Sequence, residues 1–201
     1  MKRTVLLLFV LVVIGAAPAV AAPILFSASL SGANESPANA SPATGFAEVT
    51  IDPVAHTLHV QVTFQDLVAP NTASHIHVIN GPGDANPLDT VGPVATTTPT
   101  FTGFPSGTTS GAYDHIFDSS LATTYRAGFV TDAGGVAAAE AALFDAIMTG
   151  RAYLNIHSQT FPGGEIRGFL SPVPEPASLA LLAIGGASLV GARRRRQARR
   201  S

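Results

Sequence analysis

The chain contains no cysteine and no tryptophan. The absence of cysteine excludes disulfide bonds, thiolate metal ligands and cysteine nucleophiles. Basic residues are also scarce in the middle of the chain, because residues 22–171 hold three arginines and no lysine against twelve acidic residues, a net charge of −9. Binding to nucleic acid rests on the neutralisation of phosphates by basic side chains, so no nucleic-acid partner is expected. The same charge repels anionic substrates such as superoxide.

Short motifs of common enzymes are also missing. The sequence has no G-x-S-x-G, no P-loop, no H-E-x-x-H and no dinucleotide-binding fingerprint. The aspartates of the central loops do not match a calcium-binding EF-hand loop, and we expect them to serve solubility. The sequence therefore predicts a protein that is not an enzyme.

The basic residues are concentrated at the two ends of the chain. Lys2 and Arg3 precede an apolar run over residues 5–14, and small residues follow with an A-x-A site at Ala19-Val20-Ala21. This order is typical of a secretory signal peptide, which we place at residues 1–21 with cleavage after Ala21. An uncleaved anchor is the alternative, but ten apolar residues are too few to span a bilayer.

The C-terminal segment, residues 172–201, has three parts. Pro174-Glu175-Pro176 is followed by sixteen uncharged residues, 177–192, and then by a cluster of six arginines. A helix over residues 177–192 would be about 24 Å long. This is slightly short of a hydrocarbon core of about 30 Å, but bilayers adapt to such a mismatch. The arginines should remain cytoplasmic by the positive-inside rule.

This three-part segment resembles the PEP-CTERM sorting signal of Gram-negative bacteria. The resemblance implies processing by an exosortase, a membrane peptidase that acts near Pro174-Glu175-Pro176. It also implies transient association with the inner membrane and delivery to the cell surface or extracellular matrix of bacteria that make exopolysaccharide. A plain C-terminal membrane anchor is the alternative.

The middle of the chain, residues 22–171, reads as a single β domain. Alternating or β-rich runs predict strands over residues 24–32, 44–52, 56–67, 73–80, 109–118, 151–159 and 165–170, and an alanine-rich run predicts one helix over residues 136–150. Residues 81–107 read as a long Pro/Thr/Gly region. The predicted fold is mainly β, a single antiparallel Greek-key-like sandwich or barrel with one inserted short helix. A domain of this size can be stable without disulfides.

Three of these strands share a polar-isoleucine-polar pattern. The three segments are His75-Ile76-His77, Asn155-Ile156-His157 and Glu165-Ile166-Arg167. Side chains alternate across a strand, so burial of the isoleucines turns the polar groups to the opposite face. If the strands are neighbours, these six polar side chains form one surface.

The same segments resemble a known extracellular module. "GANESPANASPATGFAEVTID", "ASHIHVINGP", "GRAYLNIHS" and "FPGGEIRGFL" are similar to successive blocks of the CHRD domain, first described in chordin. The resemblance covers about residues 24–170 and implies an all-β extracellular domain. In chordin these modules belong to a protein that binds secreted growth factors, whereas in bacteria membership implies no general activity.

Two functions remain open for the polar groups. In the leading interpretation Asn155, Arg167 and the histidines tie neighbouring strands together, in an exported, non-catalytic binding or structural module whose partners are exopolysaccharide or surface proteins. The alternative is a metalloprotein that binds Cu or Zn through His75, His77 and His157, with Glu165 as fourth ligand. A His-x-His strand on a Greek-key barrel also occurs in copper-zinc superoxide dismutase, but this is analogy of fold.

Overall fold

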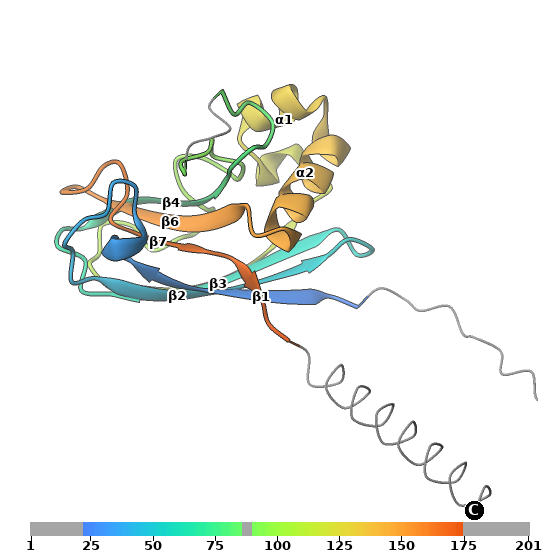
Figure 1. Cartoon of the computed structure of the whole chain (residues 1–201). Coiled ribbons are helices and arrows are strands. Elements are labelled where there is room, and N and C mark those ends of the chain that lie inside the picture. The colour runs from blue at the N-terminus through green and yellow to red at the C-terminus, as the bar shows by residue number, and fades with distance from the viewer. Residues whose placement is uncertain (1–21, 86–89, 175–201) are drawn as a thin grey trace, which may run out of the picture.

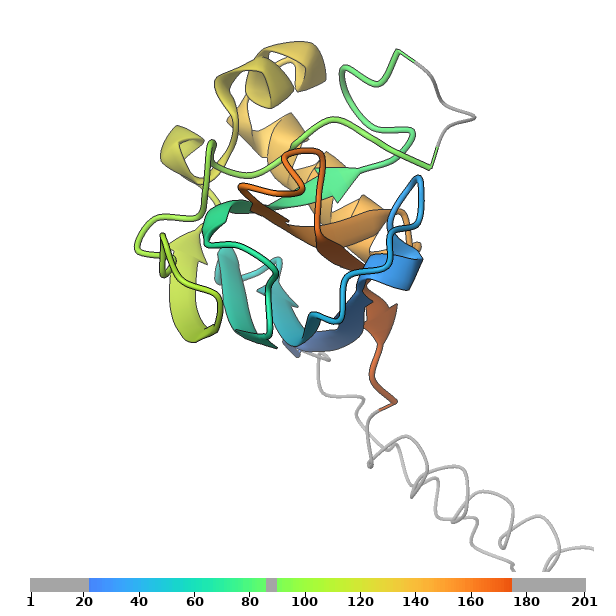
Figure 2. The ribbon, with the colours of Figure 1, turned by 90° about the vertical axis from the view of Figure 1, so that its left-hand side faces the viewer.

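The computed structural model describes residues 22–85 and 90–174, and the predicted signal peptide, apolar helix and arginine cluster lie outside them. Eight strands form one antiparallel sheet in the order β4-β6-β7-β1-β2-β3-β5, with β8 paired to β1. They are β1 (Ile24–Ser31), β2 (Thr44–Asp52), β3 (Thr57–Gln65), β4 (Asn71–Val78), β5 (Gly111–Asp118), β6 (Ala152–Ser158), β7 (Ile166–Phe169) and β8 (Ser171–Pro172). The sheet curls into a half-barrel (Figures 1 and 2), which confirms the predicted mainly β class.

The core fills the inside of this curled sheet. Every second residue of β3 faces inward, from Leu58 to Phe64, because side chains alternate along an extended strand. The isoleucines of the three polar-isoleucine-polar segments face it from the other half of the sheet. Ile76, Ile156 and Ile166 are all fully buried in one hydrophobic cluster with the β3 residues. The alternation read from the sequence therefore gives the correct inner face of both halves.

An irregular segment within the Pro/Thr/Gly region fills the gap between the two edge strands, β4 and β5. Its backbone is bonded along β4, since Ala95 N–H donates to Ile76 O and Phe101 N–H donates to Ser74 O. Phe101 also packs against aromatic side chains of the β5 side, including Tyr113. The Pro/Thr/Gly region thus includes a wall of the barrel, although its sequence has no regular strand pattern.

Two α-helices pack at one end of the half-barrel, beside β4 and β6 (Figure 1). α2 (Val136–Met148) confirms the predicted helix, and its Leu143 and Ile147 join the core. α1 (Ala127–Ala133) was not predicted, because its sequence AGFVTDA combines glycine with β-branched residues and has weak helix propensity. Its place is set by tertiary packing through the buried side chain of Phe129. The described part of the domain therefore has two inserted α-helices where one was predicted.

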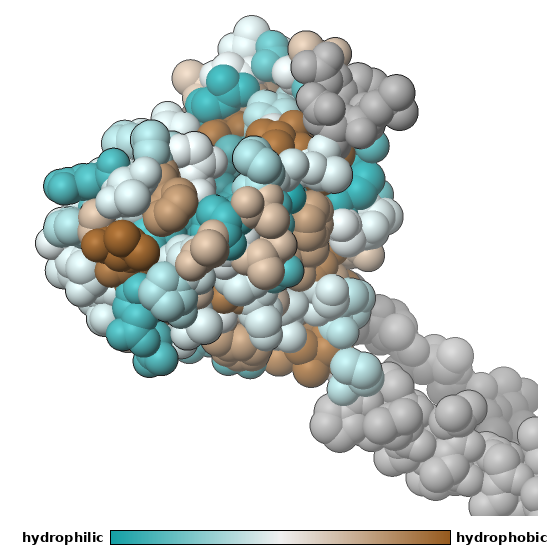
Figure 3. All heavy atoms as spheres, turned by 60° about the vertical axis from the view of Figure 1, so that its left-hand side comes forward, coloured by the Kyte–Doolittle hydropathy of each residue, from teal (hydrophilic) through white to brown (hydrophobic). Residues whose placement is uncertain are grey.

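Short helical turns and a mixed surface complete the described fold. The 3-10 turns are η1 (Gly32–Asn34) and η2 (Ala122–Thr124). On the face drawn in Figure 3, apolar side chains occur in small separate groups among polar ones. Among the described residues, no helix has the length and apolar character needed to cross a membrane.

Candidate metal centre

The pairing of β4, β6 and β7 places eight outward side chains on one face. Paired residues of antiparallel strands lie side by side on the same face. The register gives a row of His77, Tyr153 and Phe169, a row of His75, Asn155 and Arg167, and a shorter row of Ala73 and His157. We call these eight residues the covered face. The predicted neighbourhood of the three strands is confirmed, with Asn155 at the centre of the polar groups.

The polar part of this face is buried, although it lies outside the barrel. The three histidines, Asn155 and Arg167 are each 8% exposed or less. Loops cover them, because carbonyl groups of residues 92, 99 and 162 accept bonds from the histidines, and carbonyl groups of residues 34 and 90 accept bonds from Arg167. The polar surface expected from the strand pattern is therefore an interior layer between the sheet and its loops.

Each histidine of the layer is held through Nδ1. His75 Nδ1 lies 3.0 Å from Pro99 O, His77 Nδ1 lies 2.7 Å from Gly92 O, and His157 Nδ1 lies 3.0 Å from Pro162 O. A carbonyl oxygen can only accept, so Nδ1 carries the hydrogen in all three rings. In the neutral imidazole the Nε2 atom then has a free lone pair, which is the form that binds a metal ion.

The three rings converge on one point. One ring nitrogen from each of His75, His77 and His157 lies within 4.8 Å of the other two, and the two Nε2 atoms of His75 and His157 are 3.0 Å apart. With Nδ1 protonated in both rings, two lone pairs face each other at this distance and repel. His77 Nε2 is buried without a hydrogen-bond partner among the described residues. A metal ion, which binds imidazole nitrogen at about 2.0–2.1 Å, would satisfy all three atoms.

The surroundings keep the rings neutral. Burial, reinforced by the neighbouring imidazole of His157, lowers the pKa of His75 to about 4. Burial and the adjacent His75 lower the pKa of His77 to about 3, and burial also lowers the pKa of His157. A neutral ring with its hydrogen on Nδ1 keeps the Nε2 lone pair available to a metal ion.

Two other residues of this interior layer, Tyr153 and Glu35, were not predicted from the sequence. The Tyr153 ring stacks on His77 with centroids 4.7 Å apart, and the guanidinium of Arg167 lies 4.8 Å from the Tyr153 ring centre. The Glu35 carboxylate lies 3.8 Å from Arg167, and burial, opposed by Arg167, raises the pKa of Glu35 to about 7. Tyr153 could have been found by extending the alternation of β6 by one step, whereas Glu35 sits in a loop without a pattern.

A family model for the CHRD domain matches residues 26–170. The chain belongs to the CHRD family. A second model, for the PEP-CTERM protein-sorting motif, matches residues 172–196 and indicates an exported protein that is sorted through the membrane to the cell surface by exosortase processing. No curated protein and no solved structure matches the chain significantly.

Glu165, the predicted fourth ligand, is not part of the histidine group of the CHRD domain. Its carboxylate Oε1 accepts hydrogen bonds from Ser41 Oγ and from the backbone N–H of Val68, which lie in the loops before β2 and after β3. Glu165 is completely buried there. It joins the two halves of the barrel at one end, and the expectation that it shares the histidine site has no support in this geometry.

The predicted sorting and cleavage residues are only partly described. Pro174 is the last described residue, and Glu175, Pro176, Ala19 and Ala21 lie outside the described ranges. The match to the sorting motif nevertheless includes Pro174, Glu175 and Pro176. Processing at this motif therefore rests on the sequence match.

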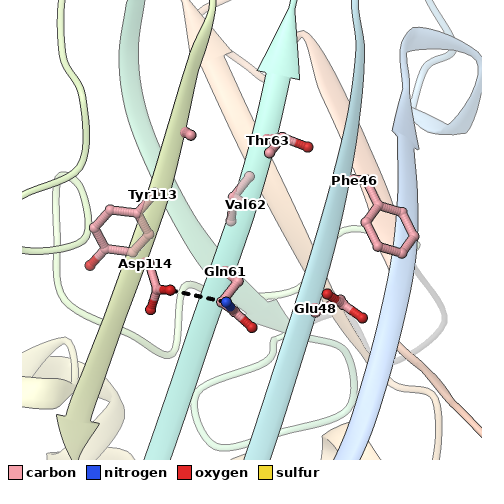
Figure 4. A pocket seen from close by; sticks show the side chains of 8 residues that line it. Phe46, Glu48, Gln61, Val62, Thr63, Tyr113 and Asp114 are labelled. Carbon is pink, nitrogen blue, oxygen red and sulfur yellow. Dashed lines mark hydrogen bonds between the residues drawn. The ribbon is translucent and has the colours of Figure 1, made fainter.

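The other half of the CHRD domain carries a comparable set of outward residues that is open to solvent. Strands β2, β3 and β5 place them in three rows, which we call the open face: Phe46, Thr63, Ala112; Glu48, Gln61, Asp114; and Thr50, His59, Ile116. Residues of the first two rows line a shallow depression of about 370 Å³. Figure 4 shows their side chains. Gln61 Nε2 donates to Asp114, and His59 Nε2 lies 2.6 Å from the same carboxylate.

Proposed function

We propose that the exported CHRD domain is a non-catalytic module that binds one Cu or Zn ion through His75, His77 and His157. The observation that carries the proposal is the convergence of three imidazoles whose Nδ1 atoms are all bonded to backbone carbonyls. Such outer partners fix the tautomer and the ring orientation of metal-binding histidines. The site is thus preorganised on the strands of a rigid sheet.

A purely structural role for the histidines accounts less well for this arrangement. A tie between strands needs a donor for each acceptor, but the Nε2 atoms of His75 and His157 face each other and that of His77 has no described partner. Each buried polar atom without a partner costs about 1–3 kcal/mol. A bound metal ion removes this cost at all three nitrogens.

Burial of the ligands supports a binding role over a catalytic one. A catalytic metal site keeps an open position for substrate. Here the rings of all three histidines are nearly inaccessible, under loop carbonyls that hold them. We place the mature module at the cell surface or in the matrix, where exopolysaccharide and surface proteins are the candidate partners.

Metal analysis of the protein purified without a histidine tag tests the proposal. We expect one equivalent of Cu or Zn, a higher melting temperature on adding the ion to metal-free protein, and loss of both in His77→Ala. His59→Ala on the open face is the matched control and should keep the metal. A protein that is isolated metal-free, and whose melting temperature does not change with Cu or Zn, would return the histidines to a structural role.

A further inference from the structure

We infer that the three-histidine site prefers a monovalent ion, and that its occupant is Cu(I) rather than Cu(II) or Zn(II). This inference rests on the proposed metal-binding function and adds to it the oxidation state of the metal. It follows from the charges that the sheet and loops place around the three rings.

The ligand set itself carries no negative charge. Three neutral imidazoles supply the nitrogens, and among the residues that the structure describes no carboxylate belongs to the group. Glu165 is bonded to Ser41 and Val68, and Glu35 lies beside Arg167. A bound ion therefore keeps its full charge in a buried site. The cost of burying a charge rises with its square, so a divalent ion costs about four times as much as a monovalent one.

A fixed cation on the same face increases the preference for a monovalent over a divalent ion. Arg167 lies in one row with Asn155 and His75, and its guanidinium is held by the carbonyls of Asn34 and Thr90 and lies over the Tyr153 ring. At 4% exposure it is poorly screened by water. When the neighbouring Glu35 is protonated, the repulsion of a divalent ion by Arg167 is twice that of a monovalent one at the same place.

The number of ligands also favours a monovalent copper ion over zinc. Structural zinc sites are almost always four-coordinate, whereas this group consists of three histidine nitrogens, and the predicted fourth ligand, Glu165, is not part of it. Imidazole suits copper, and a d¹⁰ monovalent ion is satisfied by three donors. The geometry thus fits an ion that needs neither a fourth ligand nor an anionic one. In an exported protein, such a site would hold copper in its reduced state.

Two ions that do not change oxidation state separate charge from redox chemistry. Ag(I) stands in for Cu(I), and Zn(II) represents divalent ions. We expect the full-length protein to bind one equivalent of Ag(I) at least tenfold more tightly than Zn(II), by competition titration against chelators of known affinity. Under anaerobic conditions Cu(I), measured against bicinchoninate, should follow Ag(I).

A matched pair of substitutions changes the charge without changing the ligands. Asn155→Asp puts a carboxylate at the centre of the covered face, and we expect it to raise the Zn(II) affinity at least tenfold while changing the Ag(I) affinity less. Gln61→Glu makes the same change at the centre of the open face and should leave both affinities unaltered.

The outcomes distinguish the inference from the function on which it rests. If the unsubstituted protein binds Zn(II) as tightly as Ag(I), or more tightly, the preference for a monovalent ion is wrong although the metal site stands. If neither ion nor Cu(I) binds, the proposed function itself is wrong. If Asn155→Asp does not fold, the ratio of the two affinities in the unsubstituted protein still decides.

Discussion

The covered face and the open face are built in the same way and differ in what lies above them. Each is formed by three neighbouring antiparallel strands, and each has an amide at its centre, Asn155 in one and Gln61 in the other. Loops close over the first face, where Asn155 is 3% exposed. On the second face Gln61 bonds to a solvent-exposed carboxylate (Figure 4). The loops therefore determine which of the two faces has buried polar groups.

The same residue types contribute differently to the free energy of unfolding when they are buried and when they are exposed. A polar group in water can exchange one partner for another, but a buried group that loses its partner pays the full cost of desolvation. Substitutions on the covered face should thus have large effects, and equivalent substitutions on the open face should have small ones. The following predictions test this contrast, in order of decreasing effect.

Arg167→Ala should be the most destabilising of these changes. It removes the donor to Asn34 O and Thr90 O, the contact with the Tyr153 ring, and the cation beside Glu35. Two carbonyls in part-buried hydrogen bonds lose their donor, and each such loss costs about 1–3 kcal/mol. Urea unfolding measures the loss, with Gln61→Ala, expected within about 0.5 kcal/mol of the unsubstituted protein, as the control. A loss below about 1 kcal/mol would contradict the assigned role of Arg167.

Glu165→Ala should cost about 2–3 kcal/mol, because it leaves the Ser41 hydroxyl and the Val68 N–H buried without their acceptor. Glu48→Ala, in the central row of the open face, should change the free energy of unfolding by about 0.5 kcal/mol or less. Equal losses in the two variants, measured by denaturant titration, would remove the distinction between the buried carboxylate and the partly exposed one.

Glu35 should make stability depend on pH. Its folded pKa of about 7 lies above the ordinary 4.5, so its contribution is fully present below pH 4.5 and is lost as the pH rises through 7. Glu35→Gln, which imitates the protonated form, should melt at the same temperature as the unsubstituted protein at pH 5 and a few degrees higher at pH 8.5. Differential scanning calorimetry of the two proteins measures this, and a constant difference across the pH range would contradict it.

His59→Ala should have the smallest effect. His59 pairs with Asp114 on the open face, where partly exposed ion pairs contribute about 0–1 kcal/mol and weaken with salt. We expect thermal unfolding to change little and the difference to decrease between low and high salt. A large, salt-independent loss would show that the open face is less solvated than its geometry indicates.

The same contrast explains what the sequence could and could not predict. Alternation fixes the inner side of β3, β4 and β6, and the three isoleucines lead directly to the polar side of the covered face. It also brings His75, His77 and His157 onto one surface. Alternation is determined by neighbours along a strand, so it contains no information about loops that fold back over the opposite face. Burial of the polar groups was therefore not predictable.

Two misses have the same physical origin. Glu165 lies one residue before β7, and its carboxylate bonds to two loops that are distant in the sequence. The helix α1 has weak intrinsic propensity and is placed by the packing of Phe129. In both cases the decisive contacts are long-range, and a local pattern in a single sequence does not carry them.

The short strand β8 has a consequence for the release of the domain. Ser171 and Pro172 pair with Ser27 and Phe26 of β1, and Val173 N–H donates to Leu25 O. The sheet thus continues to the residue before Pro174 (Figure 1). A peptidase that acts at the sorting motif would meet a folded body immediately beside its target. Its access would depend on fraying of two paired residues, a local opening that needs much less free energy than global unfolding. The rate of processing should then respond to the pairing of β8 with β1 and be insensitive to the stability of the domain as a whole.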